Sequence, residues 1–135
     1  MTDTLPSGRA TGSDTLTVGQ VARAAGVTAN AVRFYESYGV VSAHRNGGNA
    51  RRFTVDAICR IRLARAAQRV GITLKESADI LSGIPPLCPD PDRWAAAGEE
   101  LVRMGRERIS RLQETVNELS TLGFLVADQS ASRRP

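Results

Sequence analysis

The chain has 135 residues, of which 41% are hydrophobic, and carries 18 Lys and Arg against 14 Asp and Glu, a formal net charge of +4. This length suits one domain with an extension, and no run of eighteen apolar residues is present to span a membrane. Residues 1–15 are rich in Ser, Thr, Gly and Asp and lack the apolar core of a secretory signal. We therefore expect them to form a disordered leader and the protein to be cytoplasmic. Two cysteines, Cys59 and Cys88, give no disulfide framework of the kind found in small secreted proteins.

The positive charge is concentrated in the first part of the chain. Residues 1–83 contain 11 basic and 6 acidic residues, a net charge of +5, whereas residues 84–135 contain 7 basic and 8 acidic residues, a net charge of −1. This asymmetry indicates a polyanionic partner for the N-terminal part and a different kind of contact for the C-terminal part. An ordinary solvated surface is the alternative, because a charge of this size is a weak signal.

Two short helices are predicted near the start of the chain. Thr17-Val18-Gly19-Gln20 has the form of a capping box, so a helix is expected over residues 18–25. Thr28 is a second N-cap candidate and opens a helix expected over residues 28–38. Gly26 lies between them, where the chain must turn. Two helices joined by a short turn that contains glycine predict a helix-turn-helix.

The stretch HRNGGNARRF, residues 44–53, follows this motif. Its central Asn46-Gly47-Gly48-Asn49 consists of residues that tolerate positive φ, which is typical of a hairpin turn. Val40–Val41 and Arg52–Phe53 are expected to be the two strands of this hairpin, or wing. Arginines on a flexible hairpin suit phosphates or the minor groove of DNA. The wing carries Arg45, Arg51 and Arg52.

Two further helices should complete this unit, which we expect to comprise residues 16–83. Thr54 is expected to cap a helix over residues 55–70, and Thr73 opens a third capped helix that ends near Leu81. Cys59 lies next to an apolar position and is expected to be a buried structural cysteine. The side chains expected to be buried from the longer helix are Val55, Ile58, Ile61 and Ala64.

The remaining sequence predicts a connector and a long helix. Residues 84–91 contain four prolines and should be stiff and non-helical. A helix is predicted over residues 92–123, followed by a flexible tail over residues 124–135. Apolar residues recur in the helix at spacings of three and four, which is typical of a coiled-coil seam. A second copy of the chain is expected to cover this seam, and packing against its own domain is the alternative. The seam consists of Val102, Gly105, Ile109, Leu112, Val116 and Leu119.

These elements together predict a mainly α protein, a winged helix-turn-helix domain followed by a long coiled-coil dimerisation helix. Two copies would present two DNA-binding units symmetrically, as proteins that read palindromic DNA sites do. An enzyme is not expected, because no nucleophile is paired with a base and the one histidine, His44, lies in the wing.

The stretch VGQVARAAGVTANAVRFYESYGVV, followed by RNGGNARRF, resembles the MerR family of bacterial transcription regulators. The wing sequence is similar to that of the SoxR-like branch, and the resemblance extends over about residues 16–122. It implies an antiparallel coiled-coil homodimer bound to double-stranded promoter DNA with a long spacer between the −35 and −10 elements. Such a regulator activates by bending and untwisting the spacer, so that RNA polymerase engages both elements.

The resemblance also implies roles for single residues. Arg33, Tyr35 and Arg52 would contact phosphates, although Tyr35 has the alternative of a core aromatic. Arg45, Asn49 and Arg51 would anchor the wing. Thr28 and Asn30 are candidates for base edges or nearby phosphates, and Phe34 is expected in the core or in a stacking contact.

One part of the resemblance fails. Members of the SoxR-like branch hold a [2Fe–2S] cluster through four cysteines after the dimer helix. Residues 121–128 read TLGFLVAD here, so neither an iron–sulfur cluster nor a metal site is expected. Cys88 and Trp94, near the start of the long helix, are the candidate positions for a thiol switch or an organic effector. The alternative function is a constitutive DNA-binding repressor or architectural protein without an effector.

Overall fold

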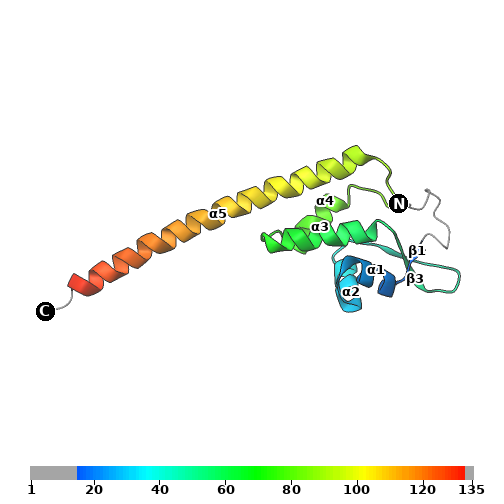
Figure 1. Ribbon diagram of the computed structural model, residues 1–135, viewed down its shortest axis with the longest axis horizontal. Coiled ribbons are helices and arrows are strands. Elements are labelled where there is room, and N and C mark those ends of the chain that lie inside the picture. Colours follow the sequence, from blue (N-terminus) through cyan, green and yellow to red (C-terminus); the bar gives the residue numbers. More distant parts are fainter. Residues whose placement is uncertain (1–14, 133–135) are drawn as a thin grey trace, which may run out of the picture.

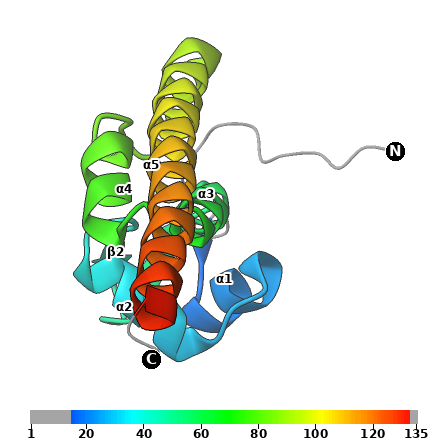
Figure 2. The same cartoon turned by 90° about the vertical axis from the view of Figure 1, so that its left-hand side faces the viewer.

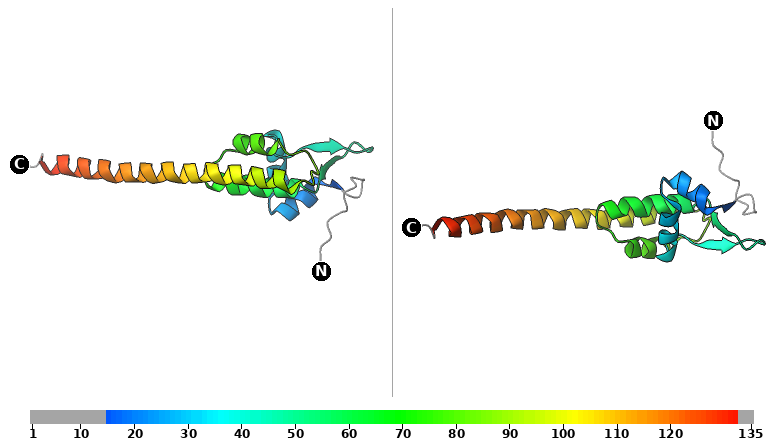
Figure 3. Two further views of the ribbon diagram at one scale, coloured as in Figure 1. Left: turned by 90° about the horizontal axis from the view of Figure 1, so that it is seen from above. Right: turned by 90° about the horizontal axis from the view of Figure 1, so that it is seen from below.

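One helix accounts for nearly a third of the chain. In the computed structural model, which describes residues 15–132, α5 spans Pro91–Ser132 and has 42 residues. At 1.5 Å per residue it is about 63 Å long. Its first part runs along the other helices, and the rest projects away from them without a neighbour in this single chain (Figures 1 and 3). All other elements form an N-terminal unit around the beginning of α5.

The helix-turn-helix is formed by α1 (Val18–Ala25) and α2 (Ala29–Ser37). The predicted capping box is confirmed: the Thr17 hydroxyl accepts a hydrogen bond from the Gln20 amide, and the Gln20 side chain accepts one from the Thr17 amide. Gly26 ends α1 with φ +74°, a left-handed conformation that glycine adopts without steric cost. The Thr28 hydroxyl then accepts the Ala31 amide at 3.0 Å and caps α2, as predicted.

A three-stranded antiparallel sheet in the order β1-β3-β2 forms the wing and its base. The strands are β1 (Thr15–Leu16), β2 (Ala43–Arg45) and β3 (Arg51–Thr54). The prediction of a strand at Val40–Val41 is wrong. Both valines are buried under the helices with at most 2% exposure, so their apolar character reflects the core and not a pleated strand. Strand β1 was not predicted, and it includes Thr15, which we had assigned to the leader.

The unit is completed by α3 (Ala57–Arg69) and α4 (Leu74–Leu81). Helix α3 begins later than predicted, and Thr54 does not cap it. Its hydroxyl donates to the carboxylate of Asp56, which occupies the N-cap position without capping α3 through its side chain. The capping box at the start of α4, formed by Thr73 and Glu76, is confirmed.

The core lies where the helices of the unit meet the inner face of the sheet. Ile61 and Ala64 of α3 are fully buried as predicted, but Val55 and Ile58 are only partly buried. Cys59 is exposed, so the expectation of a buried structural cysteine is wrong. The largest fully buried side chains are Phe53, Ile61, Ile72, Leu81, Val21, Val32, Val40 and Ser77.

Helix α5 packs on the unit only through its first turns. Figure 2, seen from the end of the molecule, shows α4 and α3 on the two sides of α5. Ala97 and Leu101 are buried in this contact, and Gly105 lies against Val70, where an added Cβ would come within 3.4 Å of a valine methyl carbon. Proline at the first helical position suits a helix start.

The end of α5 differs from the prediction. The helix continues to Ser132, so residues 124–132, which we assigned to a flexible tail, are helical. Gly123 does not end the helix, because a glycine in a helix interior costs only about 1 kcal/mol relative to alanine. The predicted leader, apart from Thr15, and residues 133–135 lie outside the described residues.

Candidate nucleic-acid interface

The exposed side of α2 carries polar and aromatic side chains. Asn30 and Arg33 are both exposed and lie three residues apart, which places them on one side of the helix. Phe34 is 52% exposed and makes an edge-to-face contact with Tyr38, with ring centroids 5.1 Å apart. The stacking contact expected for Phe34 is therefore present. This side of α2 presents hydrogen-bonding groups and one fixed positive charge to a partner.

Tyr35 points the other way. It is only 6% exposed, and its hydroxyl donates to Oε1 of Gln68 in α3 at 3.4 Å. The ring is thus one of the aromatic groups of the core, which was the alternative interpretation of this residue. Contact between its hydroxyl and a phosphate remains a prediction.

The tip of the wing is held together by its own hydrogen bonds. Oδ1 of Asn46 accepts from the amides of Gly48 at 2.9 Å and Ala50 at 3.1 Å. Asn49 adopts φ +63°, and its carbonyl accepts from Nη1 of Arg45 at 3.0 Å. Arg45 and Asn49 therefore brace the turn, while most of the Arg45 guanidinium remains available to a partner.

The wing is attached to its neighbours by two arginines. Nη1 of Arg51 in β3 forms an ion pair with Glu36 in α2, with an N–O distance of 2.5 Å. Nε of Arg52 donates to the hydroxyl of Thr15 in β1 at 3.0 Å. The first contact joins the wing to the recognition helix and fixes their relative position. The second joins the wing to the edge strand.

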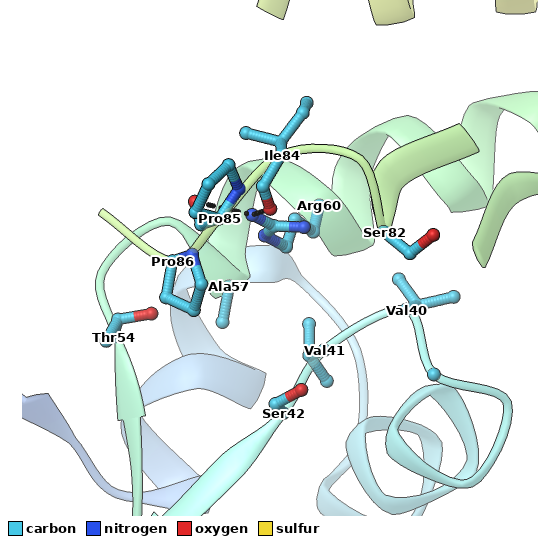
Figure 4. A pocket seen from close by; sticks show the side chains of 11 residues that line it. Val40, Val41, Ser42, Thr54, Ala57, Arg60, Ser82, Ile84, Pro85 and Pro86 are labelled. Atoms are coloured by element: carbon cyan, nitrogen blue, oxygen red, sulfur yellow. Dashed lines mark hydrogen bonds between the residues drawn. The ribbon is translucent and has the colours of Figure 1, made fainter. Parts of the chain in front are cut away.

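Sequence reasoning missed Arg60, which is buried with 8% exposure (Figure 4). Its Nε forms an ion pair with Asp56 at 2.9 Å. Nη1 donates to the carbonyl of Leu81 at 2.8 Å, and Nη2 donates to the carbonyl of Ile84 at 2.6 Å. The guanidinium also lies 5.2 Å from the Trp94 ring, a cation–π contact. Arg60 thus joins α3, the end of α4, the connector and α5.

A sequence signal for Arg60 existed. Positions 57, 60, 61 and 64 share one face of a helix, and the other three are apolar. An arginine on such a face, four residues after an aspartate, is expected to be buried only with a partner. A cavity of about 180 Å³ lies beside it, lined by residues 39–42 and by the connector, as Figure 4 shows.

The two candidate effector residues lie close together. Cys88 is partly buried, and its carbonyl accepts from Nε1 of Trp94 at 3.2 Å. Within residues 15–132, no group of three or more His, Cys, Asp or Glu side chains is placed to hold a metal ion. None of the helices described is long and apolar enough to cross a membrane.

The predicted seam of α5 is exposed in the single chain. Its five larger side chains, Val102, Ile109, Leu112, Val116 and Leu119, are 54–63% exposed, and Phe124 beyond them is 78% exposed. A groove of about 870 Å³ between α3 and α5 continues from the first half of this seam. An apolar stripe of this length on one copy is typical of a protein-protein contact. The apolar lining of the groove includes Leu63, Ala67, Val70, Leu101, Val102 and Ile109.

Comparison with known proteins gives consistent matches. Residues 16–84, which contain α1–α4 and the wing, match the family model described as MerR HTH family regulatory protein. A SoxR homolog of Chromobacterium violaceum, described as an HTH-type transcriptional activator, is 33% identical over 108 residues, which are 79% of this chain and 73% of the relative. The mercuric resistance operon regulatory protein of Serratia marcescens is 36% identical over 108 residues, 78% of this chain and 75% of the relative. The crystal structure of a MerR family transcriptional regulator from Bacillus thuringiensis has the same fold, with a TM-score of 0.52 at 19% identity, and the match covers 84% of this chain and 98% of that one.

Proposed function

Because this chain belongs to the MerR HTH family of DNA-binding transcription regulators, which are not enzymes, we propose that it is a homodimeric promoter-binding activator that responds to a signal. In this proposal α2 and the wing contact the operator, and α5 holds the two copies together. Activation comes from distortion of a promoter with a long spacer, which aligns both promoter elements for RNA polymerase.

The observation that carries the DNA-binding part is the ion pair between Glu36 and Arg51. It couples the wing to α2, so the two elements meet the duplex as one surface. Asn30 and Arg33 then face the major groove, where side chains from the recognition helix reach base edges and phosphates. Arg45 on the wing faces the adjacent phosphates or the minor groove. Arg52 is partly buried and supports the wing from its inner side.

The dimer is supported by the exposed seam. In an antiparallel pair whose two-fold axis lies midway between Ile109 and Leu112, Val102 of one copy meets Leu119 of the other. Residues after Leu119 then reach the level of the groove between α3 and α5 of the other copy, so its apolar lining is covered as well. Full burial of a single Val or Leu side chain contributes about 1.5–3 kcal/mol. Several such side chains stabilise a dimer against the cost of association.

Activation by distortion follows from this geometry. Two DNA-binding units held at a fixed separation by a stiff coiled coil fit one arrangement of two half-sites. A duplex with a different relaxed shape has to bend or untwist to contact both units. Smooth bending of a site of this size costs about 1–6 kcal/mol, which phosphate and base contacts can offset.

The signal is the least constrained part of the proposal. The chain has two cysteines, and a [2Fe–2S] cluster takes four protein ligands, so we do not assign the cluster of the SoxR-like branch. We place the responsive position at Cys88 and Trp94, because their hydrogen bond links the connector to the start of α5. A change in the connector would alter the angle between the DNA-binding unit and the coiled coil. The second candidate function, a constitutive repressor or architectural protein, needs no such position.

In vitro transcription from the region upstream of the protein's own gene tests this proposal. Reduced, oxidised and metal-loaded wild-type protein would be compared with Cys88→Ser and with Cys59→Ser, a matched control at an exposed cysteine. The proposal predicts a change in transcript level that Cys88→Ser abolishes and Cys59→Ser retains, while the DNA stays occupied. Constant transcription in every condition, with the promoter still bound, would favour the constitutive alternative.

A further inference from the structure

Two long stretches of the N-terminal unit contain no acidic residue. Residues 15–35 include α1 and most of α2, and residues 57–75 include all of α3. Helices α1 and α3 pack against each other, so the two stretches form one continuous side of the unit. This side, which we call the α1–α3 arginine face, carries four exposed arginines: Arg23, Arg62, Arg65 and Arg69.

The geometry of the face comes from the end of α1. Nη2 of Arg62 donates to the carbonyl of Ala24 at 3.0 Å, and Nη1 of Arg65 donates to the carbonyl of Gly26 at 3.3 Å. Both guanidinium groups therefore lie across the C-terminal end of α1, where the helix leaves carbonyls without intrahelical partners. Each of these bonds uses one of the five N–H donors of a guanidinium. A hollow of about 370 Å³ is lined by Ala25, Arg62, Arg65, Ala66 and Arg69.

No carboxylate neutralises this face. Within the part of the chain that the structure describes, the arginines in ion pairs are Arg51, Arg60, Arg103 and Arg108. The wing arginine Arg51 has Glu36 as its partner, whereas the arginines of the face have only carbonyl oxygens or water. Four like charges on packed helices repel one another, which is unfavourable unless an anionic partner is bound.

The face and the wing are attached to opposite ends of the recognition helix. The wing meets α2 through Glu36, in its last turn. Arg65 contacts Gly26, two residues before the N-cap Thr28, so the face borders the first turn of α2. In a helix-turn-helix the first helix crosses the DNA backbone while the second lies in the major groove. A backbone on that side of the groove would therefore pass the arginine face.

We propose that the α1–α3 arginine face is a second phosphate-binding surface, which holds the DNA backbone at the N-terminal end of the recognition helix. The ligand is duplex DNA outside the groove that α2 reads. This inference rests on the proposed DNA binding through α2 and the wing, and it adds a contact on the other side. The wing and the arginine face would then hold the duplex on both sides of the major groove, which favours a bent backbone over a straight one.

The salt dependence of DNA affinity tests the proposal. Arg23→Gln and Arg69→Gln remove charge from the face without removing the two bonds that cap α1. Affinity for a duplex from the upstream region would be measured by fluorescence anisotropy over a series of KCl concentrations. Each lost phosphate contact lowers the slope of log affinity against log salt by about 0.9, and about twice that when both copies of a dimer lose it. Arg111→Gln, an exposed arginine on α5, is the matched control and should keep the wild-type slope.

Two further variants make the outcome decisive. Arg69→Lys keeps the charge and should keep the slope, which separates phosphate binding from packing. Thermal unfolding of the Arg23→Gln, Arg69→Gln double variant verifies that it is folded. A folded double variant with the wild-type slope and affinity would overturn the proposal. Failure of the proposed function has a different signature: the wild-type protein would not bind the duplex, or Arg33→Gln would bind it as tightly as wild type does.

Discussion

The N-terminal unit and α5 treat apolar side chains in opposite ways. In the unit, Phe53 and Ile61 are completely buried, and the four helices and the sheet enclose them within one chain. In α5, Leu112 is 59% exposed and Phe124 is 78% exposed, although both residues are as apolar as those of the core. The unit therefore has a complete core in one copy, whereas the seam of α5 requires a second copy. One chain carries a finished domain and half of an interface.

Charged side chains differ between the two regions in the same sense. In the unit, ion pairs and hydrogen bonds of arginines join different elements, as Arg60 and Arg51 do. In α5, Arg103 pairs with Glu100 and Glu107 of the same helix. The exception is Arg108, which pairs with Glu76 of α4 and links the two regions. Unneutralised positive charge thus belongs to the unit and an apolar stripe belongs to α5, which suits two different partners.

The largest expected effect is loss of the dimer. Leu112→Arg places a guanidinium in the middle of the seam, where burial without a partner is costly. Sedimentation velocity should show a monomer for this variant. Ser110→Arg introduces the same side chain on another side of α5 and should leave the dimer intact. A Leu112→Arg protein that sediments like wild type would contradict the coiled-coil interpretation.

A large effect on stability is expected inside the unit. Arg60→Met removes the partner of Asp56 and leaves its carboxylate partly buried without a counter-charge, which should destabilise the fold by about 3–5 kcal/mol. Urea unfolding at constant protein concentration measures this difference. Arg111→Met, on the exposed side of α5, is the control and should unfold like the wild type. Equal midpoints for both variants would show that the buried arginine is not a stabilising contact.

A moderate effect is expected at the wing. Arg52→Ala should weaken binding to all DNA sequences alike and lower the salt slope by about 1, as loss of one phosphate contact does. Because Arg52 also binds the Thr15 hydroxyl, Thr15→Val is the control: it removes this acceptor and keeps the charge. Unchanged affinity for Arg52→Ala would show that the wing assignment is wrong.

The smallest effect concerns the link between the two regions. Hydrogen bonds from the Thr73 amide and from Arg108 hold the pKa of the Glu76 carboxyl below its ordinary value. A lowered pKa in the folded state means that this contribution to stability is present above the ordinary pKa of glutamate. It is lost as the pH falls through the lowered value. The melting temperature of Glu76→Gln should therefore lie slightly below that of wild type near neutral pH, and the two should converge in acid. A constant difference at all pH values would contradict this assignment.

Local sequence signals predicted much of this fold, and contacts between distant residues account for the rest. Capping boxes at Thr17 and Thr73 depend on residues three positions apart, so the sequence shows them directly. Strand β1 has two residues and exists only because it pairs with β3, thirty-seven residues later. The buried state of Arg60 depends on carbonyls of Leu81 and Ile84, which no local pattern places beside it.

The candidate site shows the same division. Residue types and spacing placed Arg33 and Arg45 on the exposed sides of α2 and the wing, where the structure has them. They did not show that Tyr35 packs in the core or that Arg51 is paired with Glu36. The arginines of α3 were visible as a group on one face of a helix. Their place beside the recognition helix became clear only from the packing of α3 on α1.

The mass of the protein–DNA complex is the most direct test of a finished domain joined to half of an interface. Sedimentation velocity of the wild-type chain with a duplex from its own upstream region gives the number of chains on each duplex. Two chains per duplex are expected, because the operator contacts come from two units joined through α5. A stable complex with one chain per duplex would contradict this, since a single unit would then bind without the seam.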